Sequence, residues 1–295
     1  MIIDIFWIIL PLFVVMAGGA LMSKFFTINQ DTLTRILTDF FMPALVFYSL
    51  VTSELVVSEA FKLFGSTTII FILLLLAGIL YCKITSINMG AFVPSVCFMN
   101  SGFLGIPLMM LWGGLGSMNT EVIVDQIQTF YIFTIGIIIV SEGFTFKGLL
   151  EMIKTPLLWA IVLGFVFKYL EIEIPKQILE IFKFSGEGAS ALAAFTVGTA
   201  IKFSNIKIDK HVIAGLLIRF IGGFLAGWAA ITIFNIDGTM KTIIIVAASL
   251  PSAVFSYILP ARYGKDTSYA SSIVVLSTIL GLIFIPAAFT LASIV

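Results

Sequence analysis

The chain has 295 residues, of which 60% are hydrophobic and only 11% are charged. Soluble globular proteins contain about 25% charged residues, so this composition excludes a soluble protein and indicates an integral membrane protein. The 16 basic and 16 acidic residues balance. No basic surface is therefore expected, and nucleic acid is excluded as a partner.

Cysteine and histidine offer little reactive chemistry. Cys82 and Cys97 lie in apolar surroundings and lack the Cys-x-x-Cys spacing of zinc or redox sites. The single histidine, His211, stands beside Lys210 in a polar stretch, which excludes histidine triads and di-histidine metal sites. We therefore expect no enzyme activity, no metal and no cofactor, apart from H⁺ or Na⁺ as a coupling ion.

Apolar segments separated by short polar breaks recur along the whole chain. A helix needs about 20 apolar residues to cross a bilayer. The first segment is preceded by Asp4 rather than by the basic residues of a secretory signal, so we interpret it as a retained helix. The sequence predicts ten transmembrane helices, at residues 5–24, 34–53, 62–82, 89–112, 124–142, 155–171, 178–201, 210–234, 240–261 and 269–293.

Basic residues are distributed unevenly over the loops between these helices. With the N-terminus outside, ten Lys and Arg residues fall at the inner loops and five at the outer loops. Cytoplasmic loops contain the excess of these residues. We therefore expect a multi-pass protein of the cell (inner) membrane with both termini on the non-cytoplasmic side.

The two halves of the chain show weak self-similarity. Ser101 of the fourth predicted helix aligns with Ser252 of the ninth, and Asp39 of the second aligns with Glu187 of the seventh. Because five helices per half is an odd number, two related halves would have opposite orientations in the membrane. The expected division is a first inverted repeat at 1–143, a short cytoplasmic connector at 144–154 and a second repeat at 155–295.

Helix-breaking residues interrupt the fourth and ninth predicted helices. Proline removes a backbone donor, and freed backbone groups persist in a membrane only where they pack against protein or line a cavity. Inverted repeats with broken helices are typical of secondary transporters, although an ordinary proline kink is the alternative for either helix. The residues are Gly102, Gly105 and Pro107 in the fourth helix, and Pro251 and Pro260 flanking Ser252, Ser256 and Tyr257 in the ninth.

Several motifs resemble the auxin efflux carrier family, within the bile acid/arsenite/riboflavin transporter superfamily. They are Met-Pro-Ala-Leu-Val-Phe at 42–47, Asn-Ser-Gly-Phe-Leu-Gly-Ile-Pro-Leu at 100–108, the segment 250–266 and the stretch 270–278. The resemblance covers essentially the whole chain, in order. It implies an all-α membrane protein with ten helices in two inverted five-helix repeats, divided into a scaffold and a transport domain, in which the broken helices 4 and 9 cross at their prolines.

The resemblance also implies the transported substrate. Bacterial members of the family carry mono- or dicarboxylates such as malate or malonate, and plant members carry auxin. The plant carriers have a long central loop, whereas the segment 143–155 is short here, as in bacterial members. We expect alternating access, with a small carboxylate and the lipid bilayer as partners; a homodimer is left open, and a channel or ligand-sensing membrane protein is the alternative function.

Asn100 is the first candidate for substrate binding. It directly precedes the break in the fourth helix, and the resemblance assigns the matching asparagine to the substrate carboxylate. The crossing helix termini would add partial positive charge. Ser101, Ser252, Ser256 and Tyr257 are candidate hydrogen-bonding neighbours. The alternative for Asn100 is a residue that only caps the broken helix.

Three of the charged residues within predicted helices are candidates for a function. Arg219 lies about 13 Å from the polar start of the eighth helix at 1.5 Å per residue, and a charge at that depth is costly. It is a candidate counter-ion for the substrate; an ion pair with Asp39 or Glu187, or snorkelling to the interface, is the alternative. Asp39 and Glu187 are candidates to carry a coupling proton or bind Na⁺ if they are buried. Asp266 and Lys265 are expected to cap the tenth helix.

Overall fold

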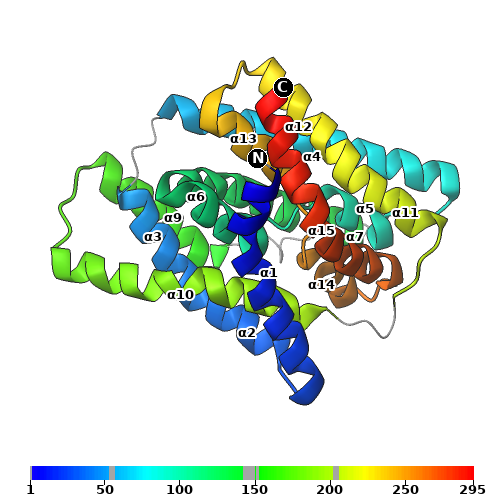
Figure 1. Cartoon of the computed structure of the whole chain (residues 1–295), viewed down its shortest axis with the longest axis horizontal. Helices are drawn as coiled ribbons and strands as arrows, with labels where there is room; N and C mark the ends of the chain where they lie inside the picture. Colours follow the sequence, from blue (N-terminus) through cyan, green and yellow to red (C-terminus); the bar gives the residue numbers. More distant parts are fainter. Residues whose placement is uncertain (1, 53–56, 142–149, 151–152, 202–205) are drawn as a thin grey trace.

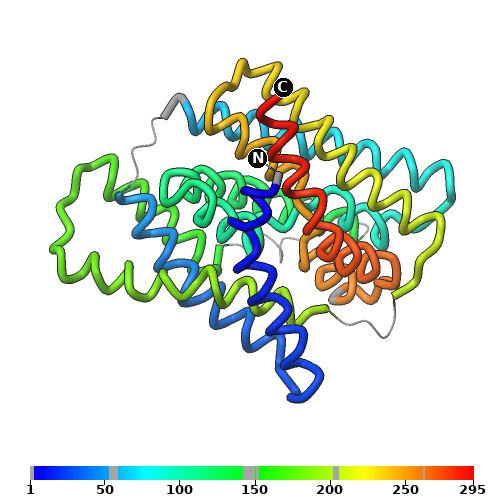
Figure 2. The backbone as a smooth tube through the Cα atoms, viewed as in Figure 1, coloured from blue at the N-terminus to red at the C-terminus, as the bar shows by residue number. Residues whose placement is uncertain are grey.

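Helices form the whole architecture. The computed structural model describes residues 2–52, 57–141, 150, 153–201 and 206–295 (Figure 1, Figure 2). Within these residues the β-structure is limited to one isolated bridge. Six helical runs are long and apolar enough to cross a membrane: Ile3–Phe25, Gln30–Thr52, Glu59–Thr85, Ser101–Ser141, Lys210–Ile233 and Ser268–Ile294.

The first helices follow the predicted apolar segments closely. Asn29 starts the second run, because its side chain accepts a hydrogen bond from the backbone N–H of Thr32. A π-helical turn then ends two residues before Pro43, which lacks a backbone donor. The elements are α1 (Ile2–Phe25), the continuous run α2 (Gln30–Ile36), η1 (Leu37–Phe41) and α3 (Met42–Thr52), and α4 (Val57–Thr85).

The fourth predicted helix is broken at its centre. It consists of α5 (Met89–Cys97), a non-helical link at 98–100, η2 (Ser101–Gly105) and the start of α6 (Ile106–Tyr131). Pro107 lies in the first turn of α6, where a missing N–H is tolerated. The break therefore falls before the glycines rather than at the proline.

The break in the polar stretch after the fourth helix is shorter than the sequence predicts. We expected a break from Gly113 to Glu121, and two helices do meet there within α6, but the non-helical backbone is confined to Gly114, whose φ of 67° suits glycine. The fifth helix consequently begins near residue 115 rather than at 124, and it continues through η3 (Ile132–Gly136) and α7 (Ile137–Ser141). The polar side chains of this stretch are buried inside the protein.

The second half contains the remaining helices. Asp209 caps the start of α11 by accepting hydrogen bonds from the N–H groups of His211 and Val212. Asp266 accepts from both the N–H and the hydroxyl of Ser268, and these bonds lower its pKa, so the expected cap on the last helix is present. The elements are α9 (Pro156–Tyr169), α10 (Lys176–Ala200), the continuous run α11 (Lys210–Leu217), η5 (Ile218–Gly222) and α12 (Gly223–Ile233), then α13 (Gly238–Ala248), α14 (Phe255–Arg262) and α15 (Ser268–Ile294).

The two breaks meet each other. Asn100 donates its backbone N–H to the carbonyl of Pro251 at 2.8 Å, and Ala253 donates to the carbonyl of Phe98 at 2.9 Å. Met99 and Ser252 form an isolated antiparallel bridge between these bonds. The crossing therefore pairs backbone groups that the broken helices leave free, which is the condition for irregular backbone inside a membrane protein.

Two groups of helices surround this crossing. One group packs α1 and α3 against α10, with α9 on α3, and Figure 1 shows α3, α9 and α10 together on the left. The other group packs α4, α5 and α11 to α15 around the breaks, with α6 lying between the groups. Most of the predicted connector at 144–154 lies outside the described residues.

Close packing of α1 on α10 depends on glycine. A Cβ atom at Gly19 would collide with the backbone carbonyl of Phe195, and one at Gly198 would collide with the carbonyl of Met16. A Cβ atom at the adjacent Gly18 would have no other atom within 4 Å. Small residues thus let the two backbones approach, as is common between membrane helices.

We predict that Gly19→Ala destabilises the protein and Gly18→Ala does not. Overpacking against a backbone atom costs about 1–3 kcal/mol, whereas alanine in an open helical position gains up to about 1 kcal/mol over glycine. The thermal unfolding midpoint of each variant in detergent measures the difference. Equal midpoints for the two variants would contradict the close contact between α1 and α10.

Candidate functional site

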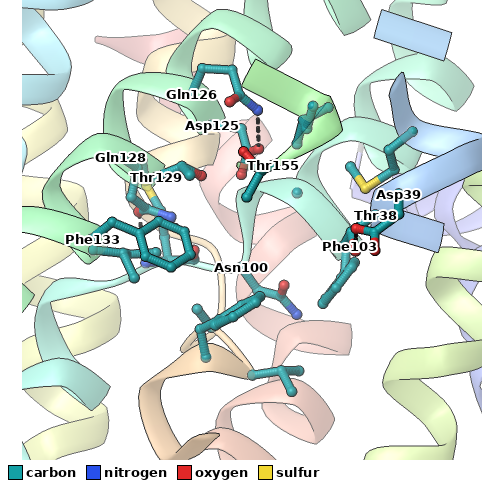
Figure 3. Close-up of a pocket in the computed structure, with 18 residues that line it drawn as sticks. Thr38, Asp39, Asn100, Phe103, Asp125, Gln126, Gln128, Thr129, Phe133 and Thr155 are labelled. Carbon is teal, nitrogen blue, oxygen red and sulfur yellow. Dashed lines mark hydrogen bonds between the residues drawn. The ribbon is translucent and has the colours of Figure 1, made fainter. Parts of the chain in front are cut away.

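A cavity lies directly beside the crossing of the two broken helices. Its wall combines residues of η1, of the first break, of α6 and of the second break, and Figure 3 shows their side chains converging on it. Phe103, Phe133 and Phe255 give it an apolar side. Its polar side is made by Thr38, Asp39, Asn100, Asp125, Gln126, Gln128, Thr129 and Thr155.

Asn100 has an unused side-chain donor at this cavity. The residue is buried, with 3% of its surface exposed, and its backbone groups bond to Pro251, Leu104 and Gly105. Its Nδ2 atom has no hydrogen-bond partner among the described residues. Buried polar groups are almost always paired, so this amide is available to a ligand that enters the cavity.

Asp125 holds the start of the half-helix that follows Asn100. Its carboxylate accepts hydrogen bonds from the Ser101 hydroxyl at 2.7 Å and from the backbone N–H of Gly102. It also accepts one from Gln126 Nε2 at 3.0 Å (Figure 3). A Cβ atom at Gly102 would lie 2.9 Å from the same carboxylate. Ser101 and Gly102, which the sequence marks as site residues, therefore both donate to Asp125, and of the two only Gly102 lines the cavity.

The side-chain amide of Gln128 bonds to both backbone groups of Met99 in the first break, as a neighbouring strand would. Its Oε1 atom accepts from the N–H of Met99 at 2.9 Å, and its Nε2 atom donates to the carbonyl of Met99 at 2.6 Å and to Ser101 Oγ at 3.1 Å. These bonds satisfy the backbone where the helix is unwound. They fix the position of the adjacent Asn100.

Glu121 lies one turn before Asp125 and is completely buried. Both of its carboxylate oxygens lack a hydrogen-bond partner among the described residues. A Cβ atom at Gly105 would collide with Glu121 Oε1, so this predicted site glycine gives the carboxyl its space. Sequence reasoning missed Glu121, Asp125 and Gln128, although their spacings of four and three residues would have placed them on one helical face.

Two of the three candidates of the second break have side-chain partners elsewhere. Ser256 donates to the carbonyl of Pro94 at 2.9 Å, and Tyr257 donates to Gln30 Oε1 at 3.0 Å. The Ser252 hydroxyl has no hydrogen-bond partner among the described residues, and the backbone N–H of Ser252 donates to Ser277 Oγ at 3.0 Å. None of the three lines the cavity at Asn100.

A second cavity lies between α2 and α14. Gln30, Asp31 and Thr34 line it from α2, and Tyr257 lines it from α14. It shares Phe103 and Val254 with the cavity at Asn100. Those shared residues form the wall between the two cavities.

Arg219 joins the ends of two half-helices. It is fully buried, its Nη1 atom donates to the carbonyl of Val96 at 3.0 Å, and its Nη2 atom donates to the carbonyl of Ala248. These carbonyls lie in the last turns of α5 and α13, where acceptors are unpaired and the helix dipole is negative. Arg219 does not line the cavity at Asn100, so its geometry is that of a cap rather than of a substrate counter-ion.

Asp39 and Glu187 are both exposed, so neither meets the condition of burial on which a coupling role was expected. Asp39 is an exposed residue at the rim of the cavity, where it accepts a hydrogen bond from the Thr38 hydroxyl at 2.9 Å. Glu187 is exposed on α10 and lines neither cavity. Its side of α10 faces away from α1 and α3, which pack against the opposite, glycine- and alanine-rich side.

Comparisons with known proteins indicate membrane transport. The model of a family described as membrane transport protein matches residues 143–288. An uncharacterized transporter of Methanothermobacter thermautotrophicus is 25% identical over 88% of this chain and 87% of its own length. An uncharacterized transporter of Methanocaldococcus jannaschii is 22% identical over 89% of this chain and 91% of its own length.

The chain is therefore a membrane transport protein with several membrane-spanning helices. The family match and the two relatives support the resemblance of its sequence motifs to the auxin efflux carrier family.

Proposed function

We propose that this protein is a secondary transporter that moves a small organic anion, a mono- or dicarboxylate, across the cell membrane by alternating access. The observation that supports it most directly is the unpaired, buried amide of Asn100 in a cavity at the crossing of two broken helices. An amide N–H donates well to a carboxylate. Phe103, Phe133 and Phe255 suit the apolar body of such an anion.

The arrangement of helices supports a moving and a fixed domain. In this proposal the chain has ten transmembrane helices in two inverted repeats, 1–143 and 155–295. The group of α1, α2 to α3, α9 and α10 is the scaffold, and α4 to α7 with α11 to α15 is the transport domain. The cavity lies where η1 of the first group faces α6 and the breaks of the second. Rocking of one domain against the other would expose this cavity to either side.

The position of the cavities suggests which state the structure represents. The second cavity lies between the start of α2 and α14, at the loops that the distribution of Lys and Arg assigns to the cytoplasm. With both termini outside, this second cavity lies on the cytoplasmic side. We therefore assign the structure to the inward-open state of the transport cycle.

Transport by purified protein in liposomes tests the proposal. A thermal-shift screen with malonate, malate and indole-3-acetate first identifies a ligand that stabilises the protein. Counterflow of that labelled ligand is then measured with the unlabelled compound inside. Saturable counterflow supports a carrier, whereas current that follows voltage without saturation would establish a channel, and ligand binding without flux would establish a sensor.

A further inference from the structure

Two acidic residues behind the cavity are not explained by substrate binding alone. Glu121 and Asp125 lie four residues apart on one face of α6, with 0% and 6% of their surfaces exposed. Asp125 borders the cavity and has hydrogen-bond donors, whereas Glu121 lies deeper and has none among the described residues. The pair thus leads from the cavity into the interior of the protein.

Few charged side chains face Glu121 from the elements that pack against α6. The helical segments η2 and α3, which pack against α6, contain no charged residue. The charged residues of α1, α4, α10 and α13 that the structure describes are all exposed or half-buried. Asp125 acts on Glu121 through its charge, and Asp39 of η1 faces Asp125 from the rim of the cavity (Figure 3).

A carboxylate in these surroundings is unstable as an ion. Burying an ionised group without a partner costs several kcal/mol, and a second carboxylate one helical turn away adds repulsion. A carboxyl group that binds a proton avoids both costs. The unpaired Glu121 carboxyl therefore fits a proton as its ligand.

We propose that Glu121 and Asp125 form a proton-binding site that couples proton uptake to binding of the organic anion at Asn100. This inference rests on the proposed transport function. Asp125 receives the proton from the cavity, and Glu121 is the buried position that holds it. No covalent bond is made or broken other than the O–H bond of the carboxyl group.

Coupling follows from the position of Asp125 next to the anion site. As a carboxylate it accepts from Ser101 and Gly102, the residues that directly follow Asn100, and it places negative charge where the substrate carboxylate would bind. The described residues that line the cavity include Asp39 and Asp125 but no Lys, Arg or His. Proton uptake lowers this negative charge, so proton and anion each strengthen binding of the other by the same factor.

The test measures proton movement with the intact protein in liposomes. A trapped pH-sensitive dye reports proton influx when the anion identified by thermal shift is added outside. We expect influx to accompany uptake, and the apparent KM to fall by up to about tenfold for each unit of decreasing pH, the limit for one linked proton. Anion uptake without proton influx or pH dependence would overturn the inference.

Glu121→Gln locates the proton site. The variant should retain counterflow at equal pH on both sides but lose proton influx and acceleration by a pH gradient. Glu180→Gln is the matched control, because Glu180 is exposed and only pairs with Lys183 at 3.8 Å; it should behave as wild type. Proton coupling that survives in Glu121→Gln, or that is lost in Glu187→Gln, would refute the assignment.

The wild-type measurement remains decisive if Glu121→Gln does not fold. If a Na⁺ gradient accelerates uptake and a proton gradient does not, the coupling ion is Na⁺, and the assignment of a proton is refuted. Absence of any counterflow would refute the proposed transport function itself. Normal counterflow together with net anion uptake that lacks proton influx would refute only this inference.

Discussion

Replacing Asn100 by alanine is expected to lower anion uptake by about 10- to 100-fold while the protein remains folded. The lost interaction is a hydrogen bond to a charged group, which contributes about 1.5–3 kcal/mol. The backbone bonds of residue 100 to Pro251, Leu104 and Gly105 do not depend on its side chain, so the crossing survives the substitution. Counterflow of a labelled carboxylate in liposomes measures the effect.

A stability measurement distinguishes substrate binding from a structural role of Asn100. Its amide donor is buried without a partner, and such a group costs stability rather than contributing to it. We therefore expect the thermal midpoint of Asn100→Ala to be equal to or above that of the wild type. A fall in midpoint with unchanged uptake would show that Asn100 only supports the helix.

Asn119 provides the matched asparagine control. It is also buried, but its Nδ2 atom donates to the carbonyl of Ser49 at 3.1 Å, and it does not line the cavity. Asn119→Ala removes a satisfied hydrogen bond, so its midpoint should fall by an amount that corresponds to about 1 kcal/mol. Its KM for the anion should not change.

The helices and their breaks can be predicted from the sequence, because the thickness of the bilayer and the hydrogen bonding of the backbone constrain both. Apolar length marks each span, and glycine with proline marks where a helix is interrupted. The crossing itself required the family resemblance, since pairing between Met99 and Ser252 joins residues that are far apart in the chain. Local composition does not encode such a contact.

The acidic residues of α6 could not be placed from composition alone. A polar stretch in a membrane protein forms a loop when it is exposed to water, and it can form a functional site when it is buried inside the protein. Both cases use the same residue types. Glu121 follows the glycines at 113, 114 and 116, which favoured the loop interpretation for this residue, whereas Asp125 fell within the predicted fifth helix without being recognised as a site residue. Only the single turn at Gly114 shows that the helix resumes at once.

Arg219 shows a different limit. Its depth in the eighth helix was evident from the sequence, and depth alone indicated that it needs a partner. The partners are carbonyl groups of Val96 and Ala248, and a carbonyl leaves no trace in the sequence because every residue has one. A search restricted to oppositely charged side chains therefore led to Asp39 and Glu187.

Arg219→Met is expected to lower the free energy of unfolding by about 3 kcal/mol, because it leaves the carbonyls of Val96 and Ala248 without their donor. Gly223 brings the end of α13 close enough for this bond, since a Cβ atom there would collide with the Ala248 carbonyl. The free energy of unfolding of Arg219→Lys should lie between those of the wild type and Arg219→Met. The single ammonium group of lysine lacks the two separate NH₂ groups with which the guanidinium group reaches both carbonyls.

The thermal midpoint and the KM of these variants separate the two roles of Arg219. A cap on α5 and α13 predicts that the midpoint falls in the order wild type, Arg219→Lys, Arg219→Met, and that exposed Arg35→Met leaves it unchanged. A substrate counter-ion predicts instead an unchanged midpoint and a raised KM in Arg219→Lys. Because the two half-helices end at the crossing, loosening their cap should also reduce the maximal rate of counterflow more than it changes KM.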